Sequence, residues 1–179
     1  MKLWLFLIGI FILAPNYAKA ENDKIDPNSF ICAEFLAISS ISGKLPEFES
    51  LQIDGYSAAS SGANIADPLS MGLIAEEVSL YCEKKPSEVI LPFWKKLRTS
   101  IPLPKEGKWD AEKATCKDFI DDEDTGSGFV VWLDGYNRQK SNNTSSILEN
   151  NTIFNDYLNS CRIKPEEKML DLMREILKK

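Results

Sequence analysis

Three short segments of the chain occur twice, in the same order. Cys-x-x-Phe begins at Cys32 and again 84 residues later. Asp-Gly-Tyr occupies 54–56 and again 134–136, and Cys-x-x-Lys-Pro occupies 82–86 and 161–165. The offsets are 84, 80 and 79 residues, so the two copies differ only by small deletions. Each copy contains two of the four cysteines. We therefore predict two small units in tandem, each with its own disulfide.

The cysteine count is even, which in an exported protein favours disulfides over metal or redox chemistry. Four cysteines allow three pairings, and the repeat favours Cys32–Cys82 and Cys116–Cys161, one within each unit. In the chain-entropy description, each bond of this loop length stabilises the fold by about 4 kcal/mol. This matters because units of about 70 residues bury too little surface to be very stable alone.

The first 20 residues are expected to be a secretory signal peptide. Lys2 precedes an apolar stretch at 3–13, and Ala18-Lys19-Ala20 fits an A-x-A cleavage site. The apolar stretch is shorter than the 17 or so residues that a membrane span needs, so we expect no membrane anchor. Losing two lysines from 21 basic and 27 acidic residues leaves a net charge of −8. That charge disfavours nucleic acids and anionic membrane surfaces as partners.

The periodicity predicts an all-α protein with two tandem domains of about four helices each. The predicted boundaries are 27–101 for the first domain, 102–108 for a linker with two prolines, and 109–179 for the second domain. In the first domain, Pro92 predicts a kink or a late start in the last helix. Helices are expected to begin near Asn28 or Ser29, Pro46, Asp67 and Pro86, and then near Thr115, Ser127, Thr152 and Pro165.

The chain contains no histidine, which removes the commonest general base and the commonest metal ligand. The acidic run 121–124 is expected to be a solvated loop, because position 12 of an EF-hand counted from Asp121 would be Trp132 rather than glutamate. No Ser-x-x-Lys signature is present either. We therefore expect no catalytic residue, no metal site, no cofactor and no enzymatic activity, and any response to pH has to come from carboxylates.

The repeated Asp-Gly-Tyr segment has two interpretations. It could be a recognition site, or its glycine could let two helices approach closely while the tyrosine packs with its hydroxyl outward. A helical glycine costs about 1 kcal/mol relative to alanine. Because the glycine is kept in both copies, the packing interpretation is favoured.

Together these features resemble the HdeA/HdeB family of periplasmic acid-stress chaperones. The resemblance rests on the signal peptide, on Cys-x-x-Phe-Leu/Ile, on the Cys-x-x-Lys-Pro tail, on an amphipathic last helix, and on Trp132-Leu133-Asp134-Gly135-Tyr136, and it extends over both units. It implies a small helical fold with one disulfide and a neutral-pH dimer that loosens in strong acid and binds unfolding proteins through apolar surface. Cys32, Cys82, Cys116 and Cys161 match the disulfide positions of the family.

Family members are single units that pair as dimers, whereas here two units share one chain. We therefore hypothesise an intramolecular pseudo-dimer, with Trp94 and Trp132 near the shared surface. Below about pH 2 the mature chain would keep 19 basic side chains while its carboxylates are protonated. Self-repulsion would then loosen the packing while the disulfides limit expansion.

Two functions are consistent with these expectations. The first is a periplasmic or secreted acid-stress chaperone that holds acid-unfolded envelope proteins. The alternative is an inhibitor or immunity-type protein that binds one specific partner at neutral pH. The residues that we expect at a domain interface or in contact with client proteins are Tyr56, Phe93, Trp94, Trp132 and Tyr136.

Overall fold

The computed structural model describes residues 24–102 and 106–178. Within them the chain is all-α, with eight α-helices and one short 3-10 helix. The predicted signal peptide lies outside the described residues, as does the middle of the predicted linker. The first half contains α1 (Cys32–Ser42), α2 (Glu47–Ser61), α3 (Pro68–Cys82) and α4 (Ile90–Ser100). The second half contains α5 (Cys116–Ile120), α6 (Glu123–Ser141), η1 (Ile147–Glu149), α7 (Asn151–Ile163) and α8 (Met169–Ile176).

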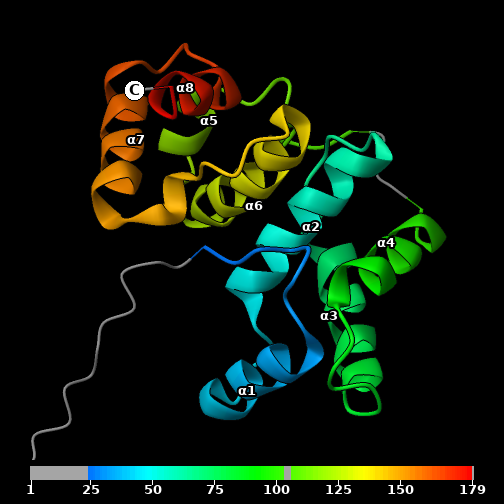
Figure 1. The fold of residues 1–179 in the computed structure, drawn as a ribbon. Helices are drawn as coiled ribbons and strands as arrows, with labels where there is room; N and C mark the ends of the chain where they lie inside the picture. Colours follow the sequence, from blue (N-terminus) through cyan, green and yellow to red (C-terminus); the bar gives the residue numbers. More distant parts are fainter. Residues whose placement is uncertain (1–23, 103–105, 179) are drawn as a thin grey trace, which may run out of the picture.

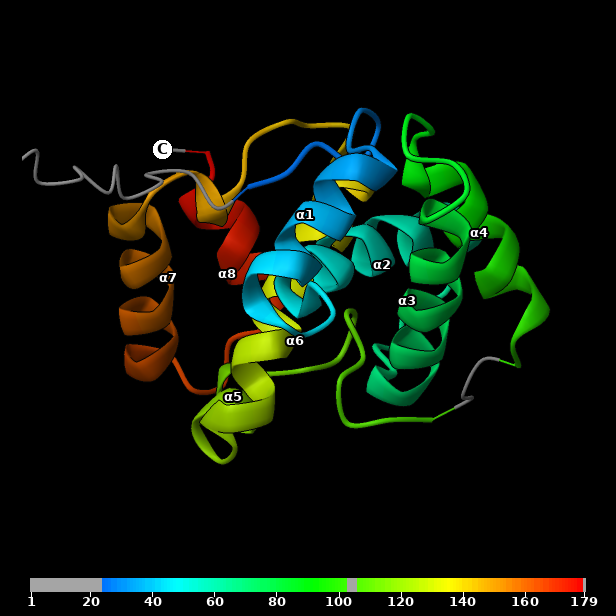
Figure 2. The ribbon, with the colours of Figure 1, turned by 90° about the horizontal axis from the view of Figure 1, so that it is seen from below.

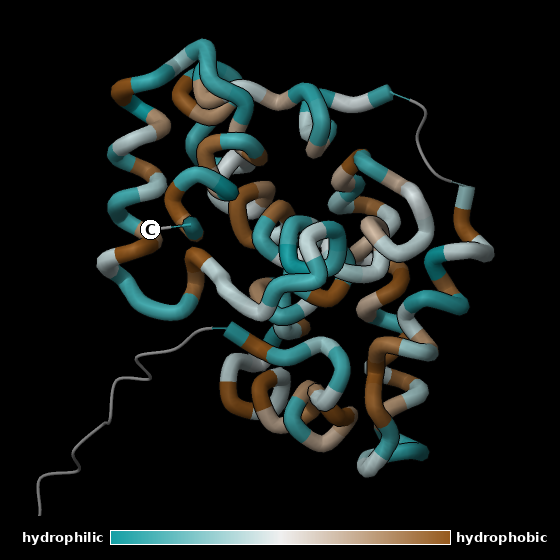
Figure 3. Tube along the Cα trace, turned by 45° about the horizontal axis from the view of Figure 1, so that its top comes forward, coloured by the Kyte–Doolittle hydropathy of each residue, from teal (hydrophilic) through white to brown (hydrophobic). Residues whose placement is uncertain are grey.

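Helices α2 and α6 cross at the centre of the molecule and make its most extensive contact between elements (Figure 1). Helices α3 and α4 lie on one side of this crossing, and α7 and α8 lie on the other, as the second view also shows (Figure 2). Figure 3 shows apolar segments in the helices of both halves, whereas several connecting turns are hydrophilic.

Each half contains one disulfide, as predicted. Cys32 pairs with Cys82 and joins the start of α1 to the end of α3, and Cys116 pairs with Cys161 and joins α5 to α7. Both bonds are completely buried. Each disulfide therefore ties the first helix of its half to the helix that precedes the last one.

The same backbone hydrogen bonds surround both disulfides. In the first half Cys32 N donates to Glu88 O and Ile90 N donates to Phe30 O, and in the second half Cys116 N donates to Glu167 O and Met169 N donates to Ala114 O. The isolated bridges Ile31–Val89 and Thr115–Lys168 occupy matching places. The two halves thus fold the ends of the sequence repeat in the same way.

Several helix starts follow the capping rules used for the predictions. The Asp67 carboxylate accepts a hydrogen bond from Leu69 N, and Pro68 occupies the first turn of α3. Thr115 and Asp118 form a capping box at α5. Helix α4 begins late, at Ile90, so that Pro92 lies in the first turn, where its missing N–H leaves no intrahelical bond unmade.

Other predicted boundaries were wrong. Of the predicted acidic loop 121–124, Asp121 and Asp122 form a turn, but Glu123 and Asp124 belong to α6, because the Asp122 side chain caps the helix and it starts at Glu123 rather than near Ser127. Helix α1 begins after Ile31 rather than at Asn28 or Ser29, because residues 26–30 form turns bound to the Asp26 carboxylate and carbonyl.

The last two helices also begin at other residues than predicted. Asn150 rather than Thr152 caps α7, since its side chain accepts from Ile153 N. Helix α8 begins at Met169 rather than near Pro165, because the intervening residues form the turn that binds α5. At α7 an earlier cap was available than the one chosen from the sequence, whereas α8 starts without a side-chain cap.

The apolar core has two parts. One cluster lies wholly within the first half, around the disulfide, Phe35, Ile74 and Trp94. The larger cluster is centred on α6 in the second half, but it includes Ala58 and Ala59 of α2. Leu51 of α2 packs against both clusters. Helix α2 therefore contributes to the core of each half.

Candidate functional site

The crossing of α2 and α6 is the strongest candidate site, and two glycines make it possible. A Cβ atom at Gly55 would collide with the backbone carbonyl of Trp132, and a Cβ atom at Gly135 would collide with the carbonyl of Gln52. Gly55 and Gly135 are separated by 80 residues, as are Gln52 and Trp132. Each glycine therefore contacts the repeat equivalent of the other glycine's partner, which is the reciprocal arrangement of a two-fold interface.

The structure confirms the close helix packing at the glycines of the Asp-Gly-Tyr segment, but Tyr136 is 1% exposed rather than pointing outward into solvent. Both glycines allow the helix backbones to touch, as expected. The Tyr56 hydroxyl accepts a hydrogen bond from Asn28 Nδ2, and the Tyr136 hydroxyl donates to Glu112 Oε1. Burial, followed by this bond to Glu112, raises the pKa of Tyr136 above its usual value. The tyrosine hydroxyls thus lie away from the glycine contact and are satisfied by other residues.

The first aspartate of the repeat, Asp54, joins the two halves. Its completely buried carboxylate accepts hydrogen bonds from Trp94 Nε1 at 2.9 Å and from Trp132 Nε1 at 2.8 Å, and it forms an ion pair with Arg98. Trp94 and Arg98 belong to α4, whereas Trp132 belongs to α6. Burying a charge is costly unless it is paired and hydrogen-bonded, and here partners from both halves meet that need.

The second aspartate, Asp134, binds only residues of its own half. Its carboxylate pairs with Arg138 Nε at 3.1 Å and accepts hydrogen bonds from Ser146 Oγ at 2.8 Å and Ile147 N at 3.0 Å. Burial raises the pKa of Asp134, and the attraction of Arg138 with the bonds from Ser146 and Ile147 only partly offsets this effect. The group holds the turn before η1 against α6.

Arg138 provides a second link between the halves. Its guanidinium donates from Nη1 to Ile25 O at 2.7 Å and from Nη2 to Gln52 Oε1 at 3.2 Å, and Gln52 Oε1 also accepts from Ile25 N. Lys24 forms a further ion pair with Glu149 at 3.1 Å. The segment that precedes α1 is therefore fixed onto the second half by polar contacts.

The structure brings together three of the five aromatic residues that the sequence singled out. Trp94 and Trp132 meet at Asp54, and the rings of Trp132 and Tyr136 stack with centroids 5.4 Å apart. Phe93 instead stacks on Tyr81, with centroids 4.1 Å apart, inside the first half. Tyr56 is partly buried in the same first-half cluster.

Sequence reasoning missed the charged residues of this site. Asp54, Arg98, Asp134 and Arg138 are all nearly inaccessible to solvent, although charged residues are rarely buried without a partner. One signal was present, because an aspartate precedes the glycine in both copies and lies between apolar residues in each. The arginines gave no comparable signal, since neither has an arginine at the equivalent position of the other copy.

The site consists of a close helix contact and of buried charges that are paired with one another. Among residues 24–102 and 106–178, no group of three or more His, Cys, Asp or Glu side chains could hold a metal ion. In the same part of the chain, none of the helices has the length and apolarity required to cross a bilayer.

One part of the chain is similar to a known protein family. Residues 98–171 match the HdeA/HdeB family. The matched range begins near the end of α4 and ends in α8, so the expected resemblance is confirmed for the second half only. No curated protein and no solved structure matches the chain.

Proposed function

We propose that this protein is an acid-stress chaperone of the periplasm, which loosens at low pH and holds unfolding envelope proteins on apolar surface. The match of residues 98–171 carries the proposal, because the HdeA/HdeB family consists of non-enzymatic periplasmic acid-stress chaperones that bind acid-unfolded proteins. The two disulfides support it, since they suit an oxidising compartment outside the cytoplasm.

The α2–α6 crossing is, in this proposal, the contact that acid opens. It would be the intramolecular counterpart of the dimer contact that the family resemblance implies, with the two halves as tandem copies of one unit. The reciprocal glycine contacts support this idea. Opening would expose apolar residues that the halves now cover for each other, including Ala58, Trp132 and Leu51.

Carboxylates whose pKa is lowered in the fold supply the acid sensitivity. Hydrogen bonds from Thr125, and then a bond and an ion pair with Lys108, lower the pKa of Asp122 to about 2. At Asp26, burial raises the pKa, but hydrogen bonds from Asn28 and Ser29 outweigh it, so that the net shift is downward. Such groups stabilise the fold above the unfolded pKa near 3.8, and this contribution is lost as the pH falls through their folded values.

Asp134 has the opposite sign and is not the trigger. Because its pKa is raised in the fold, protonation of Asp134 in acid favours the folded state over the unfolded chain. The loosening is therefore assigned to the accessible carboxylates and to the repulsion among the remaining positive charges. The disulfides would keep each half compact while the halves separate.

Light scattering of an acid-unfolded client protein tests the proposal. The oxidised protein should suppress aggregation at about pH 2–3, where its carboxylates are mostly protonated, and should have little effect at pH 7. Absence of suppression at both pH values would contradict it. In parallel, the emission of Trp132 should shift to the red over the same pH range in a Trp94→Phe/Trp109→Phe variant of the mature chain, in which it is the one remaining tryptophan. Suppression without that shift would support the chaperone activity but contradict the proposed opening of the α2–α6 crossing.

A specific partner at neutral pH is a second candidate, favoured by one surface of α3. Leu69, Leu73 and Leu80 are 82%, 58% and 54% exposed and share one side of the helix. Such a partner would be captured from envelope extract at pH 7, and a Leu73→Gln/Leu80→Gln variant with unchanged helicity would lose it. Chaperone activity that survives this substitution, with no partner captured, would exclude the second candidate.

A further inference from the structure

One of the positions at which the two crossing helices differ in sequence exchanges a large side chain for none. Gly128 of α6 follows Phe48 of α2 by 80 residues, the offset that also relates Gly135 to Gly55. Gly135 and Gly55 have no room for a side chain, but a Cβ atom at Gly128 would meet only Leu51 Cδ1, at 3.7 Å. That distance is ordinary contact, so nearby atoms do not require glycine at residue 128.

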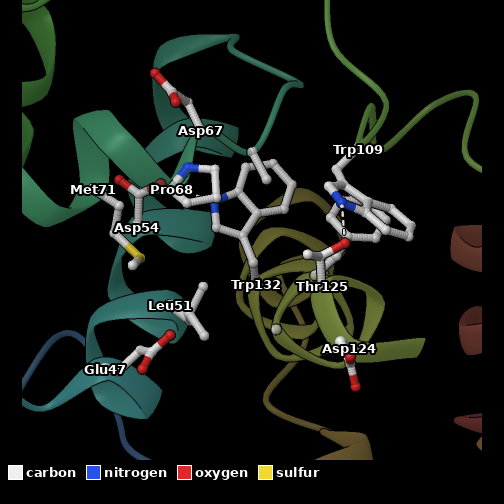
Figure 4. Close-up of a pocket in the computed structure, with 13 residues that line it drawn as sticks. Glu47, Leu51, Asp54, Asp67, Pro68, Met71, Trp109, Asp124, Thr125 and Trp132 are labelled. Atoms are coloured by element: carbon white, nitrogen blue, oxygen red, sulfur yellow. Dashed lines mark hydrogen bonds between the residues drawn. The ribbon is translucent and has the colours of Figure 1, made fainter. Parts of the chain in front are cut away.

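The space left beside Gly128 belongs to a pocket of about 350 Å³. The pocket lies between α2, the start of α3 and the first turns of α6, and Trp109 forms one of its sides (Figure 4). Figure 4 shows Trp132 reaching from α6 towards Pro68 and Asp54. The volume of the pocket is in the range of small-molecule sites, which are mostly apolar with a few polar groups. The apolar lining residues are Leu51, Ala66, Pro68, Met71, Trp109, Phe129 and Trp132.

The polar lining of the pocket is acidic. Four carboxylates line it, those of Glu47, Asp54, Asp67 and Asp124, and none of its lining residues is lysine or arginine. Asp54 is neutralised by Arg98, but the other three lie at partly or fully exposed positions. Carboxylates on several sides of an apolar cavity favour a positively charged ligand over an anion.

The aromatic lining favours the same class of ligand. Trp109, Phe129 and Trp132 form a stacked series with ring centroids 5.0 Å and 5.7 Å apart. Aromatic faces attract organic cations, and tryptophan does so most strongly. A bare metal ion does not fit, because the described residues include no cluster of ligands for one.

We propose that this pocket binds a small organic cation with an apolar body, such as an aromatic amine or a quaternary ammonium compound. The apolar body would lie beside Gly128 against Leu51 and Trp132, and the positive charge would lie in the field of the acidic lining, to which Glu47 and Asp124 contribute. This binding belongs to the folded protein at neutral pH, so it is separate from the proposed holding of clients in acid, and either activity can fail without the other.

Calorimetric titration of the oxidised protein at pH 7 tests the charge preference. The probes are 2-phenylethylammonium and 3-phenylpropionate, which have similar apolar bodies and opposite charges. We expect one saturable site for the cation and at least about tenfold weaker binding of the anion, since attraction would be replaced by repulsion. Equal affinities, or no saturable binding of either 2-phenylethylammonium or benzyltrimethylammonium, would overturn the proposal.

Substitution of Gly128 tests the location. Gly128→Phe introduces the residue of the other copy and fills the cavity, so cation binding should be lost while helicity is retained. Gly128→Ala is the matched control, because a Cβ atom fits there and the rest of the pocket stays open. Unchanged affinity in a folded Gly128→Phe variant would place the site elsewhere and defeat the proposal.

A second pair of variants tests the carboxylates without filling the cavity. Glu47→Gln/Asp124→Asn should weaken cation binding about three- to tenfold, in keeping with the loss of two partly screened charges. Glu76→Gln/Glu77→Gln removes the same charge from exposed positions of α3 that do not line the pocket, and it should leave the affinity unchanged. Equal weakening by both pairs of substitutions would indicate a general effect of net charge and would refute binding of the cation in this pocket.

Discussion

Asp54 and Asp134 occupy the same position of the sequence repeat, but their carboxylates bind different parts of the molecule. Asp54 is bound by Trp94 and Arg98 of the first half and by Trp132 of the second. Asp134 is bound by residues of the second half alone, which include Arg138 and the turn before η1. One position of the repeat thus connects the halves in one copy and fixes a loop in the other.

The two halves also differ in the size of the apolar core around their crossing helix. The second half packs its helices around α6 and borrows Ala58 and Ala59 from α2 for its core. The first half has a smaller core and presents leucines of α3 to solvent. The second half therefore has the larger and better-covered core, and part of that core is supplied by α2 of the first half.

Removing the charge of Asp54 should have the largest effect. Asp54→Asn leaves the Arg98 guanidinium buried without its carboxylate, which typically costs about 3–5 kcal/mol. Asp134→Asn is the matched variant and should cost about 1–2 kcal/mol, because the Arg138 guanidinium keeps its hydrogen bonds to Ile25 O and Gln52 Oε1. Urea unfolding at pH 7 measures both. Equal losses would remove the distinction between the two aspartates.

Removal of a disulfide comes next. Cys32→Ala/Cys82→Ala and Cys116→Ala/Cys161→Ala should each lose about 2–4 kcal/mol. The cross-linked cysteines are 50 and 45 residues apart, so loop entropy alone predicts nearly equal losses. Thermal unfolding of the two double variants measures this balance. A clearly larger loss for the first pair would show that the less-covered half relies more on its cross-link.

The glycines of the crossing should give a smaller loss. Gly55→Ala and Gly135→Ala each place a methyl group against the opposite backbone, and overpacking of this kind costs about 1–3 kcal/mol. Gly72→Ala in α3 is the control, because its Cβ atom would meet nothing within 4 Å. That variant should gain about 0.5–1 kcal/mol from helix propensity. If the denaturant midpoint shifted in the same direction in all three variants, the close approach of the two helices would be refuted.

The smallest effect is expected at Asp122. Because the pKa of Asp122 is lowered to about 2, its ionised form stabilises the fold above the unfolded value of 3.8, and this contribution disappears as the pH falls towards 2. Asp122→Asn can still cap α6, so it should reduce the drop in melting temperature between pH 5 and pH 2 while retaining helicity. An unchanged drop in the variant would assign the acid sensitivity to other carboxylates.

The sequence predicted the features that depend on short-range rules or on the repeat. Both disulfides, the all-α class, the cap at Asp67 and the late start of α4 at Pro92 follow from residue spacing and local stereochemistry. Asp122 and Asn150 were missed as caps because several polar residues compete near those helix starts, and only the three-dimensional path decides among them.

The candidate site was predictable only in part. The glycine contact followed from the cost of a helical glycine, and the meeting of Trp94 with Trp132 was expected near a shared surface. Burial of Arg98 and Arg138 was not predictable, because an isolated arginine in an amphipathic helix normally lies in solvent. The pocket beside Gly128 depends on long-range packing of three helices, which no local pattern encodes.

The crossing of α2 and α6 joins two parts of one polypeptide, and this would change the kinetics of the opening and closing that we propose for it. A contact between separate chains re-forms by a second-order encounter, so its recovery slows as the protein becomes scarce. Here re-formation is first-order, because the partner remains tethered at a high effective concentration. The pH at which the crossing opens should therefore be the same in a cell that makes few copies of the protein as in one that makes many.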